Sequence, residues 1–332
     1  MKREYLGYSK KFMFLFRIRF YIYHFLNILI LFVPNIYLKL KHKYFFIMQD
    51  HGVGDAITLT SILYNWSKKN KVSVISLNPE IYQGLNIKNI GLKRTNFTKE
   101  LISFLGNSNH SNIVGYSNGN LLYKSSQFYA KGKKEFLREL LLEGRPDIKE
   151  RINGLEKENK IFFNESEKEE FEEKFSNILK EEYALIITGT KENSTKIWPT
   201  KNFQKVVEKT AGKIRWCQVG TSRTEELKGV LDLRGKTTLR EVFFLSSRAK
   251  FILCSEGMFT HLSSAFNTPC VTIYSGFHYP EISFYKNVIP ISSKPLPKCA
   301  YCWKSKCNLY DFPICIENIK IQDVLSKIKE IL

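Results

Sequence analysis

The sequence is short of acidic residues. Its 332 residues include 32 Asp and Glu against 51 Lys and Arg, which gives a formal net charge of +19. A balance this basic predicts an anionic partner, such as a phospholipid, a nucleotide, a nucleic acid or an acidic glycan. The basic residues are spread along the chain, and no helix-turn-helix signature, RNP motif or zinc-finger spacing occurs among them. We therefore expect no nucleic-acid partner.

A long unbroken apolar run is also missing. The most hydrophobic stretch, residues 20–37, is interrupted by two Asn, a His and a Pro. It barely reaches the roughly 20 residues that a bilayer span needs. Lys and Arg flank it, and each one near an anionic leaflet adds on the order of 1 kcal/mol to surface binding. Residues 1–43 are therefore predicted to be a basic hydrophobic segment lying on a membrane, the alternative being an amphipathic helix packed on the protein.

Strand-like and helix-like segments alternate in two blocks, and the chain is long enough for two domains. In the first block, strands are predicted at Tyr44–Met48 and Val72–Leu77, with a helix over about Ala56–Lys68 between them. A charged, helical connector is expected over about Lys131–Glu182. This order is typical of an α/β fold with a parallel sheet.

The second block begins at Tyr183 and repeats the α/β pattern. Strands are predicted at Tyr183–Thr190, Ile214–Val219, Phe251–Cys254 and Val271–Tyr274, and helices at Lys201–Thr210, Leu239–Ser247, Phe259–Phe266 and Gln322–Ile331. Two doubly wound domains that face each other would leave a cleft between their strand ends, where ligands bind in such folds.

The turn after Phe251–Cys254 is a candidate site. Glu256 and His261 lie at its two ends, and Gly257 breaks the apolar run before the next helix. Such a loop lies at the carboxyl end of a parallel sheet, where the first amides of the helix can hold an anionic group. His261 could instead be a core histidine bonded to a backbone carbonyl.

Two further loops carry candidate residues. After the first strand, Gly52 and Gly54 let the backbone approach a ligand, and Asp55 is either a general base or a helix cap. This loop lacks the third glycine of the dinucleotide fingerprint, and the chain has no Walker-type motif.

The loop after the strand that begins at Tyr183 carries Thr188, Thr190 and Lys196. Hydroxyls, a glycine and a lysine at a strand end suit a diphosphate. A polar loop with a solvated lysine is the alternative.

Three motifs occur in the order found in a known family. They are GVGD at 52–55, KIWPTKNFQKVVEK at 196–209 and DLRGKTTLREVFFLSSRAKFILCSEGMFTHLSSAFNTPCVTIYSG at 232–276. On these motifs the chain resembles glycosyltransferase family 9, the group that includes the lipopolysaccharide heptosyltransferases. The resemblance covers about Tyr44–Leu332 and is most specific in the last motif.

The resemblance implies a GT-B fold of two Rossmann-like domains. An acceptor domain is expected at 44–165 and a nucleotide-sugar domain at 166–332. Asp55 corresponds to the family aspartate that deprotonates the acceptor hydroxyl, and Lys196 to the lysine that binds the donor diphosphate. Thr188 and Thr190 fall where family hydroxyls contact phosphate.

At the last motif the sequence departs from the family pattern. Many members have Asp five residues before the His that matches His261, whereas this chain has Glu256 followed by Gly257. The spacing is kept and the acid is changed, so the transferred sugar is left open. Gly52 and Gly54 belong to the same implied donor and substrate site.

The implied reaction is transfer with inversion from a sugar diphosphate to a lipopolysaccharide or other surface-glycan acceptor. A base removes the hydroxyl proton while the other domain neutralises the leaving diphosphate. No Asp-x-Asp pair stands at a predicted strand end, in agreement with a reaction that needs no catalytic metal. The expected location is the cytoplasmic face of the inner membrane. A non-catalytic nucleotide-sugar or glycan binding protein of the same fold is the alternative.

The chain has seven cysteines, and four of them cluster near its C-terminal end. Cys299, Cys302, Cys307 and Cys315 lie within a segment of seventeen residues, 299–315. Four thiolates at this spacing suit a structural Zn or Fe ion. Reduced thiols and two disulfides are the alternatives, the latter disfavoured in a cytoplasmic chain.

Overall fold

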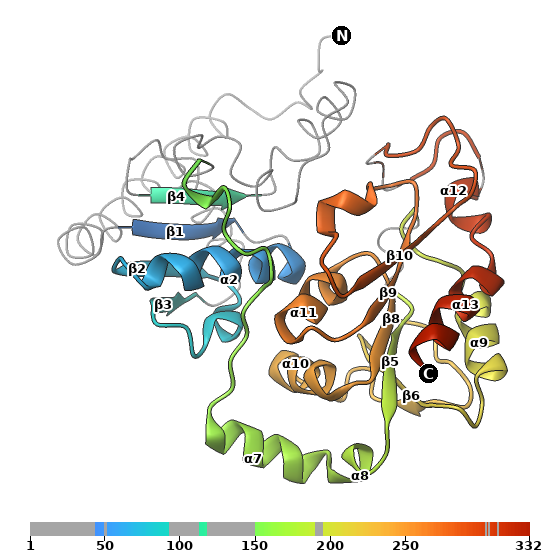
Figure 1. Cartoon of the computed structure of the whole chain (residues 1–332), viewed down its shortest axis with the longest axis horizontal. Helices are drawn as coiled ribbons and strands as arrows, with labels where there is room; N and C mark the ends of the chain where they lie inside the picture. The colour runs from blue at the N-terminus through green and yellow to red at the C-terminus, as the bar shows by residue number, and fades with distance from the viewer. Residues whose placement is uncertain are drawn as a thin grey trace, which may run out of the picture.

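The computed structural model describes residues 44–49, 52–92, 113–117, 150–189, 195–302, 304, 306–310 and 312–332, the strands at 44–49 and 113–117 by their backbone alone. These residues build two parallel sheets with helices packed around them (Figure 1). The predicted α/β class is therefore confirmed, while the membrane-associating segment 1–43 lies outside the described residues.

The first sheet has four strands in the order β3-β2-β1-β4, all parallel. The strands are β1 (Tyr44–Gln49), β2 (Val72–Ser76), β3 (Lys88–Gly91) and β4 (Ile113–Ser117). A short 3-10 helix, η1 (Pro79–Tyr82), follows β2. Parallel neighbours need crossover connections, and helix α2 (Val53–Ser67) supplies the one from β1 to β2.

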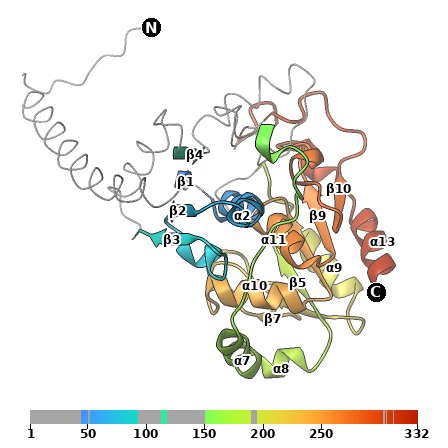
Figure 2. The same cartoon turned by 60° about the vertical axis from the view of Figure 1, so that its left-hand side comes forward.

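Helix α2 is enclosed on all sides. Every residue from Ala56 to Leu63 is buried, and eight consecutive helical positions cannot share one face. One side of α2 covers its own sheet, and another packs on helix α11 (Met258–Phe266) of the second sheet (Figure 2). Because Val53 and Gly54 belong to α2, the helix begins three residues before the predicted start at Ala56.

The second sheet has six parallel strands in the order β10-β9-β8-β5-β6-β7. The strands are β5 (Tyr183–Ile187), β6 (Arg215–Gln218), β7 (Leu231–Asp232), β8 (Phe251–Ser255), β9 (Cys270–Tyr274) and β10 (Val288–Ser292). The chain runs outward from β5 through β6 and β7, then returns to place β8 on the other side of β5. The strand order therefore reverses between β5 and β8, where open α/β sheets bind ligands.

Alternate residues of β5 enter two different cores. Leu185 and Ile187 join the cluster that contains α10 (Leu239–Arg248), α11 and α2. Ala184 and Ile186 join the cluster under α9 (Thr200–Lys209) and the C-terminal helix α13 (Ile321–Ile331). This period of two is what a strand buried on both faces requires.

A mostly non-helical segment, residues 155–164, crosses from the first sheet to the second. Its backbone bonds to both sides, since the Lys160 amide donates to Thr60 Oγ1 and the Asn159 amide to Ser264 Oγ. Arg240, on α10, adds a third link, since its guanidinium donates to the carbonyl of Glu80, on η1, at 3.4 Å and to that of Phe162 at 2.5 Å. A two-pronged ion pair with Glu167, with both N–O distances 2.7 Å, holds the guanidinium in place. These contacts join the two sheets around one continuous core.

The charged stretch that contains the crossing is only partly helical. Residues 150–182 contain α7 (Glu165–Lys174) and α8 (Ser176–Leu179), and Asn164 caps α7 by accepting a bond from the Glu167 amide. The predicted helical connector is therefore wrong for residues 155–164, where the chain must stay extended to bridge the sheets. In the part of the chain that the structure describes, no helix combines the length and the hydropathy of a membrane span.

Candidate functional site

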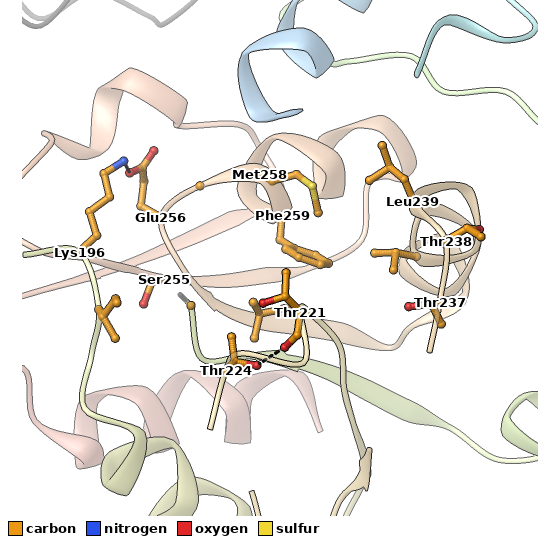
Figure 3. A pocket seen from close by; sticks show the side chains of 16 residues that line it. Lys196, Thr221, Thr224, Thr237, Thr238, Leu239, Ser255, Glu256, Met258 and Phe259 are labelled. Carbon is orange, nitrogen blue, oxygen red and sulfur yellow. Dashed lines mark hydrogen bonds and ion pairs between the residues drawn. The ribbon is translucent and has the colours of Figure 1, made fainter. Parts of the chain in front are cut away.

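A pocket of about 450 Å³ opens at the carboxyl ends of the strands, where the strand order reverses (Figure 3). Lys196, Glu256 and Gly257, three of the residues expected at the donor site, line one end of it. Thr188 directly follows β5 and lies between the lining residues Ile187 and Gly189 in the chain. The predicted Thr190 lies outside the described residues.

Two donors converge on one carboxylate oxygen at this end of the pocket. Lys196 Nζ lies 2.6 Å from Glu256 Oε2, and His278 Nδ1 lies 2.8 Å from the same oxygen. The Glu256 side chain is only 7% exposed. Phe277 supports the group, since its ring lies 4.7 Å from the ammonium of Lys196 and 4.4 Å from the ring of His278.

Burial and charge fix the protonation of this cluster. Burial by itself would raise the pKa of Glu256, but the hydrogen bonds of His278 and Lys196 and the positive charge of Lys196 hold that pKa well below its ordinary value. Burial lowers the pKa of His278 to about 4. At neutral pH the carboxylate is therefore ionised and the imidazole is neutral. The Nδ1–H tautomer of His278 follows, because an ionised carboxylate can only accept.

Two buried hydroxyls next to this cluster have no partner among the described residues. They are Thr188 Oγ1, at the end of β5, and Ser255 Oγ, at the end of β8. Ser255 lines the pocket, and Thr188 lies between two lining residues in the chain. A buried hydroxyl without a hydrogen bond costs free energy, so such a group beside a pocket is suited to hydrogen-bond a bound molecule. β5 and β8 are neighbours, which brings both hydroxyls to the same edge of the sheet.

Helix α11 begins at this edge and carries no acidic residue in its first turn. Its N-terminal amides and dipole therefore favour an anion. Gly257 precedes it, and a Cβ atom placed there would meet nothing closer than 4.0 Å. Together with the ammonium of Lys196 and the two hydroxyls, the helix start is suited to a phosphate group.

The other end of the pocket is apolar with a hydroxyl rim, and sequence reasoning did not identify it. Leu239, Val242 and Phe259 supply apolar surface. The hydroxyl-bearing residues are Thr221, Thr224, Thr237 and Thr238 (Figure 3). The available signal was the pair of threonines in each of the loops that follow β6 and β7, at the carboxyl edge of the sheet. A ring with polar edges fits this composition.

His261 does not line the pocket. It is 2% exposed, and its Nδ1 lies 2.9 Å from the hydroxyl oxygen of Tyr285. Asn159 of the crossing segment donates to the same Tyr285 oxygen and to the His261 carbonyl. Burial lowers the pKa of His261 to about 4, so its ring is neutral at pH 7. The structure therefore assigns His261 to the junction between the sheets.

Helix α2 brings the predicted glycine loop to the same junction. A Cβ atom placed on Gly54 would lie 3.2 Å from His261 Cδ2 and 3.3 Å from Met258 Cα, so a larger residue would have to push these neighbours away by a few tenths of an ångström. Asp55 is in the first turn of α2, and its Oδ2 would lie 3.1 Å from a Cβ on Gly52. Gly52 rather than Asp55 occupies the N-cap position, with Asp55 three residues inside.

The four clustered cysteines are free thiols in the structure, and all four are partly buried. Burial and the neighbouring Cys302 and Cys299 raise the pKa of Cys315. Within the described ranges, which omit residues 303, 305 and 311 of this segment, no three His, Cys, Asp or Glu side chains form a group that could hold a metal ion. The geometry of these residues therefore does not assemble the predicted tetrahedral site.

Comparisons with known proteins identify the family of the chain. The family model of glycosyltransferase family 9 (heptosyltransferase) matches residues 138–310, about half of the chain. A search of curated proteins gives no match.

Several solved structures share the fold. The Escherichia coli ADP-heptose lipopolysaccharide heptosyltransferase II superposes with a TM-score of 0.61 at 14% identity, over 87% of this chain and 98% of that one. A family 9 glycosyltransferase from Veillonella parvula gives a TM-score of 0.62 at 12% identity, over 87% and 97%. The iron-containing dodecameric glycosyltransferase TibC from enterotoxigenic E. coli gives 0.58 at 13%, over 87% and 76%. The predicted GT-B type of α/β fold is confirmed by this likeness.

Proposed function

The chain belongs to glycosyltransferase family 9, and from this membership we propose that it transfers a heptose or related sugar, with inversion, from a nucleotide diphosphate donor to a surface glycan. A lipopolysaccharide core or another lipid-linked saccharide is the proposed acceptor. The similar heptosyltransferase II is named for an ADP-heptose donor and a lipopolysaccharide product, which supports this choice of substrates.

The observation that carries the proposal is the pair of unpartnered hydroxyls, Thr188 Oγ1 and Ser255 Oγ, beside Lys196 and the start of α11. A donor diphosphate would satisfy both hydroxyls and take the charge of the ammonium. The nucleoside would then extend toward Leu239 and the threonine rim, where the pocket is apolar. Glu256 and Gly257 would form the wall beside the sugar.

Asp55 is proposed as the general base for the acceptor hydroxyl. The contact of Gly54 with Met258 supports this role, because it brings the first turn of α2 against the start of α11. A base on the first-sheet side and cations on the second-sheet side would act on opposite faces of the sugar, as inversion requires. Lys196 and the amides of α11 would neutralise the leaving diphosphate.

A donor screen tests the proposal. ADP-, GDP- and UDP-sugars should raise the melting temperature with increasing concentration. A ligand at 100 times its Kd should add about 2.7 kcal/mol to the unfolding free energy. Incubation of the best donor with a saccharide acceptor should then release nucleoside diphosphate. Lys205→Ala, on an exposed position of α9, is the matched control for Lys196→Ala.

The second candidate is a non-catalytic nucleotide-sugar or glycan binding protein, favoured by the change from Asp to Glu at position 256. Donor binding without transfer or hydrolysis, over a range of acceptors, would establish this alternative. Release of the sugar from the bound donor would exclude it.

Membrane association is proposed for the basic hydrophobic segment 1–43, at the cytoplasmic face of the inner membrane. Its charge and its apolar stretch support this role. The full chain should co-sediment with vesicles that contain anionic lipid, and a chain that starts near Lys43 should not. Equal binding of both would contradict the proposal.

A structural Zn or Fe ion at Cys299, Cys302, Cys307 and Cys315 stays a prediction from their spacing. The similar glycosyltransferase TibC is iron-containing, which supports it, whereas the geometry of the described residues does not. Elemental analysis of the purified chain, compared with Cys302→Ser, decides between the two. One equivalent of metal in the wild-type chain and none in Cys302→Ser would establish the site. No metal in either protein would exclude a metal site at these cysteines.

A further inference from the structure

Glu256 has two partners of different chemistry on a single oxygen. Lys196 lies on the loop before α9, and His278 lies on the loop after β9. Their nitrogens are 2.6 and 2.8 Å from Glu256 Oε2. Because three separate loops meet at this atom, the arrangement depends on the order of the strands and not on local sequence.

The ammonium of Lys196 cannot serve two anions equally. In the structure it neutralises Glu256, whose side chain is 7% exposed. A diphosphate that enters beside the start of α11 attracts the same ammonium, and the ionised Glu256 repels the diphosphate. When Lys196 turns toward the donor, Glu256 loses its charged partner while it remains buried. A buried carboxylate without a donor is strongly unfavourable, so a second partner has to stay in place.

His278 meets the requirements of that partner. Its imidazole is neutral at pH 7, since burial lowers its pKa to about 4, and the Nδ1–H therefore donates without adding charge. Its side chain is only 12% exposed, and its ring is held edge-to-face against Phe277 at 4.4 Å. Being neutral, it does not compete with Lys196 for the phosphates.

We propose that His278 is a positioning residue that keeps Glu256 ionised and aimed at the donor sugar after Lys196 has turned to the diphosphate. The carboxylate held in this way accepts hydrogen bonds from sugar hydroxyls and selects a polyhydroxylated donor. This inference rests on the proposed function and deepens it, because it assigns separate duties to the two partners of Glu256. Lys196 recognises the diphosphate, and His278 acts through Glu256 on the sugar.

The test compares ligands with and without the sugar. The probes are ADP, GDP and UDP alone and the corresponding nucleotide sugars, applied to the wild-type full chain and to His278→Ala. We expect His278→Ala to bind the nucleoside diphosphate within about twofold of wild type. Its affinity for the nucleotide sugar, and its kcat/KM, should fall by about 10- to 100-fold, the value of a hydrogen bond to a charged group.

His278→Asn is the second variant, and it separates positioning from folding. The amide nitrogen of Asn can occupy the place of Nδ1, so this variant should recover most of the sugar-dependent affinity. Lys286→Ala, at a side chain that is 90% exposed, is the control. The double variant Glu256→Gln, His278→Ala should bind the nucleotide sugar about as well as Glu256→Gln alone, because the carboxylate that His278 orients is absent from both.

Different outcomes overturn different statements. A His278→Ala variant that keeps the wild-type preference for the sugar-bearing ligand overturns the inference. So does His278→Asn if it loses that preference as fully as His278→Ala while remaining folded. A wild-type chain that binds the nucleotide sugars but transfers no sugar contradicts the proposed function instead, and the binding comparison still decides the role of His278.

Discussion

Helices α2 and α11 begin in the same kind of place, but only α2 carries an acidic residue in its first turn. Each follows a parallel strand of its own sheet, and each has a glycine at its N-cap, Gly52 or Gly257. The first turn of α2 contains Asp55, whereas the first turn of α11 contains no acidic residue. A carboxylate in the first turn satisfies the positive end of a helix from within, and its absence leaves that end for an external anion.

Under the proposed function, this contrast divides the reaction between the two sheets. The start of α11, together with Lys196, Thr188 and Ser255, would hold the leaving diphosphate. The start of α2 would supply the base, Asp55. The two starts touch at Gly54 and Met258, so proton removal and charge neutralisation can occur on one bound sugar. The following changes break or sharpen this division.

The largest effect is expected at Asp55. Asp55→Asn keeps the shape and removes the basicity, so kcat should fall by roughly 10²- to 10⁴-fold. Donor affinity should stay near wild type, because α11 and Lys196 hold the donor. Steady-state kinetics and donor binding measure the two quantities. Asp323→Asn, in the exposed first turn of α13, controls for the loss of a helix-dipole partner. An unchanged kcat in Asp55→Asn would show that Asp55 is not the general base.

The next effect is expected at Lys196. Lys196→Met removes the ammonium from the α11 side, and kcat/KM for the nucleotide sugar should fall by about 10²- to 10³-fold. Unlike Asp55→Asn, this variant should also bind nucleoside diphosphate more weakly. Isothermal titration with ADP, GDP and UDP checks the difference. Wild-type affinity for all three would place the diphosphate elsewhere.

Acid should destabilise the α11 side through its histidines. Burial lowers the pKa of His261 and of His278 from 6.5 to about 4, so the folded state binds fewer protons than the unfolded chain between those pH values. The unfolding free energy should therefore fall as the pH drops from 6.5 to 4, by on the order of 3 kcal/mol per histidine. Below pH 4.5, the ordinary pKa of a glutamate, Glu256 further lowers the unfolding free energy, because its carboxylate takes up a proton in the unfolded chain while it stays ionised in the folded one.

Urea unfolding at a series of pH values measures this slope. His278→Asn should remove about half of the part that the histidines contribute above pH 4.5. An identical slope in the variant would show that His278 is not held neutral in the folded chain.

The smallest expected effect is a difference in stability between variants of Gly54 and Gly257. Gly54→Val places atoms against Met258 and His261, and such overpacking costs about 1–3 kcal/mol of unfolding free energy. Gly257→Ala has open space around its Cβ, so its melting temperature should change much less. Thermal unfolding of both variants gives the comparison. Equal stability of both would mean that the contact between the helix starts is loose.

The elements around the pocket were predictable because their signals are local. The apolar run, the glycine turn and the Asn-Thr-Pro stop predict Phe251–Cys254, Phe259–Phe266 and Val271–Tyr274, and each lies within one residue of the observed element. Lys196, Glu256 and Gly257 follow from motif order. The structure places these three residues at one pocket, and their roles there stay predictions.

The rest depends on what the folded sheets bring together. His278 reaches Glu256 only because β8 and β9 are neighbours, and no spacing in the sequence encodes that bond. The early start of α2 was missed because Gly-Val-Gly-Asp is typical of a loop when the second sheet is not considered. The burial of His261 likewise results from α2 packing on α11. Asn159 joins it from the crossing segment, which the charge pattern predicts to be helical.

The enclosure of α2 also bears on how the chain unfolds. Eight of its consecutive residues are buried in a core shared by both sheets, so separating the sheets would expose that core to water. The two halves differ in topology, yet neither keeps a complete apolar interior without the other. Because α2 is shared in this way, both sheets should unfold together in one cooperative transition. The heat capacity change of unfolding should then scale with the surface that both sheets expose.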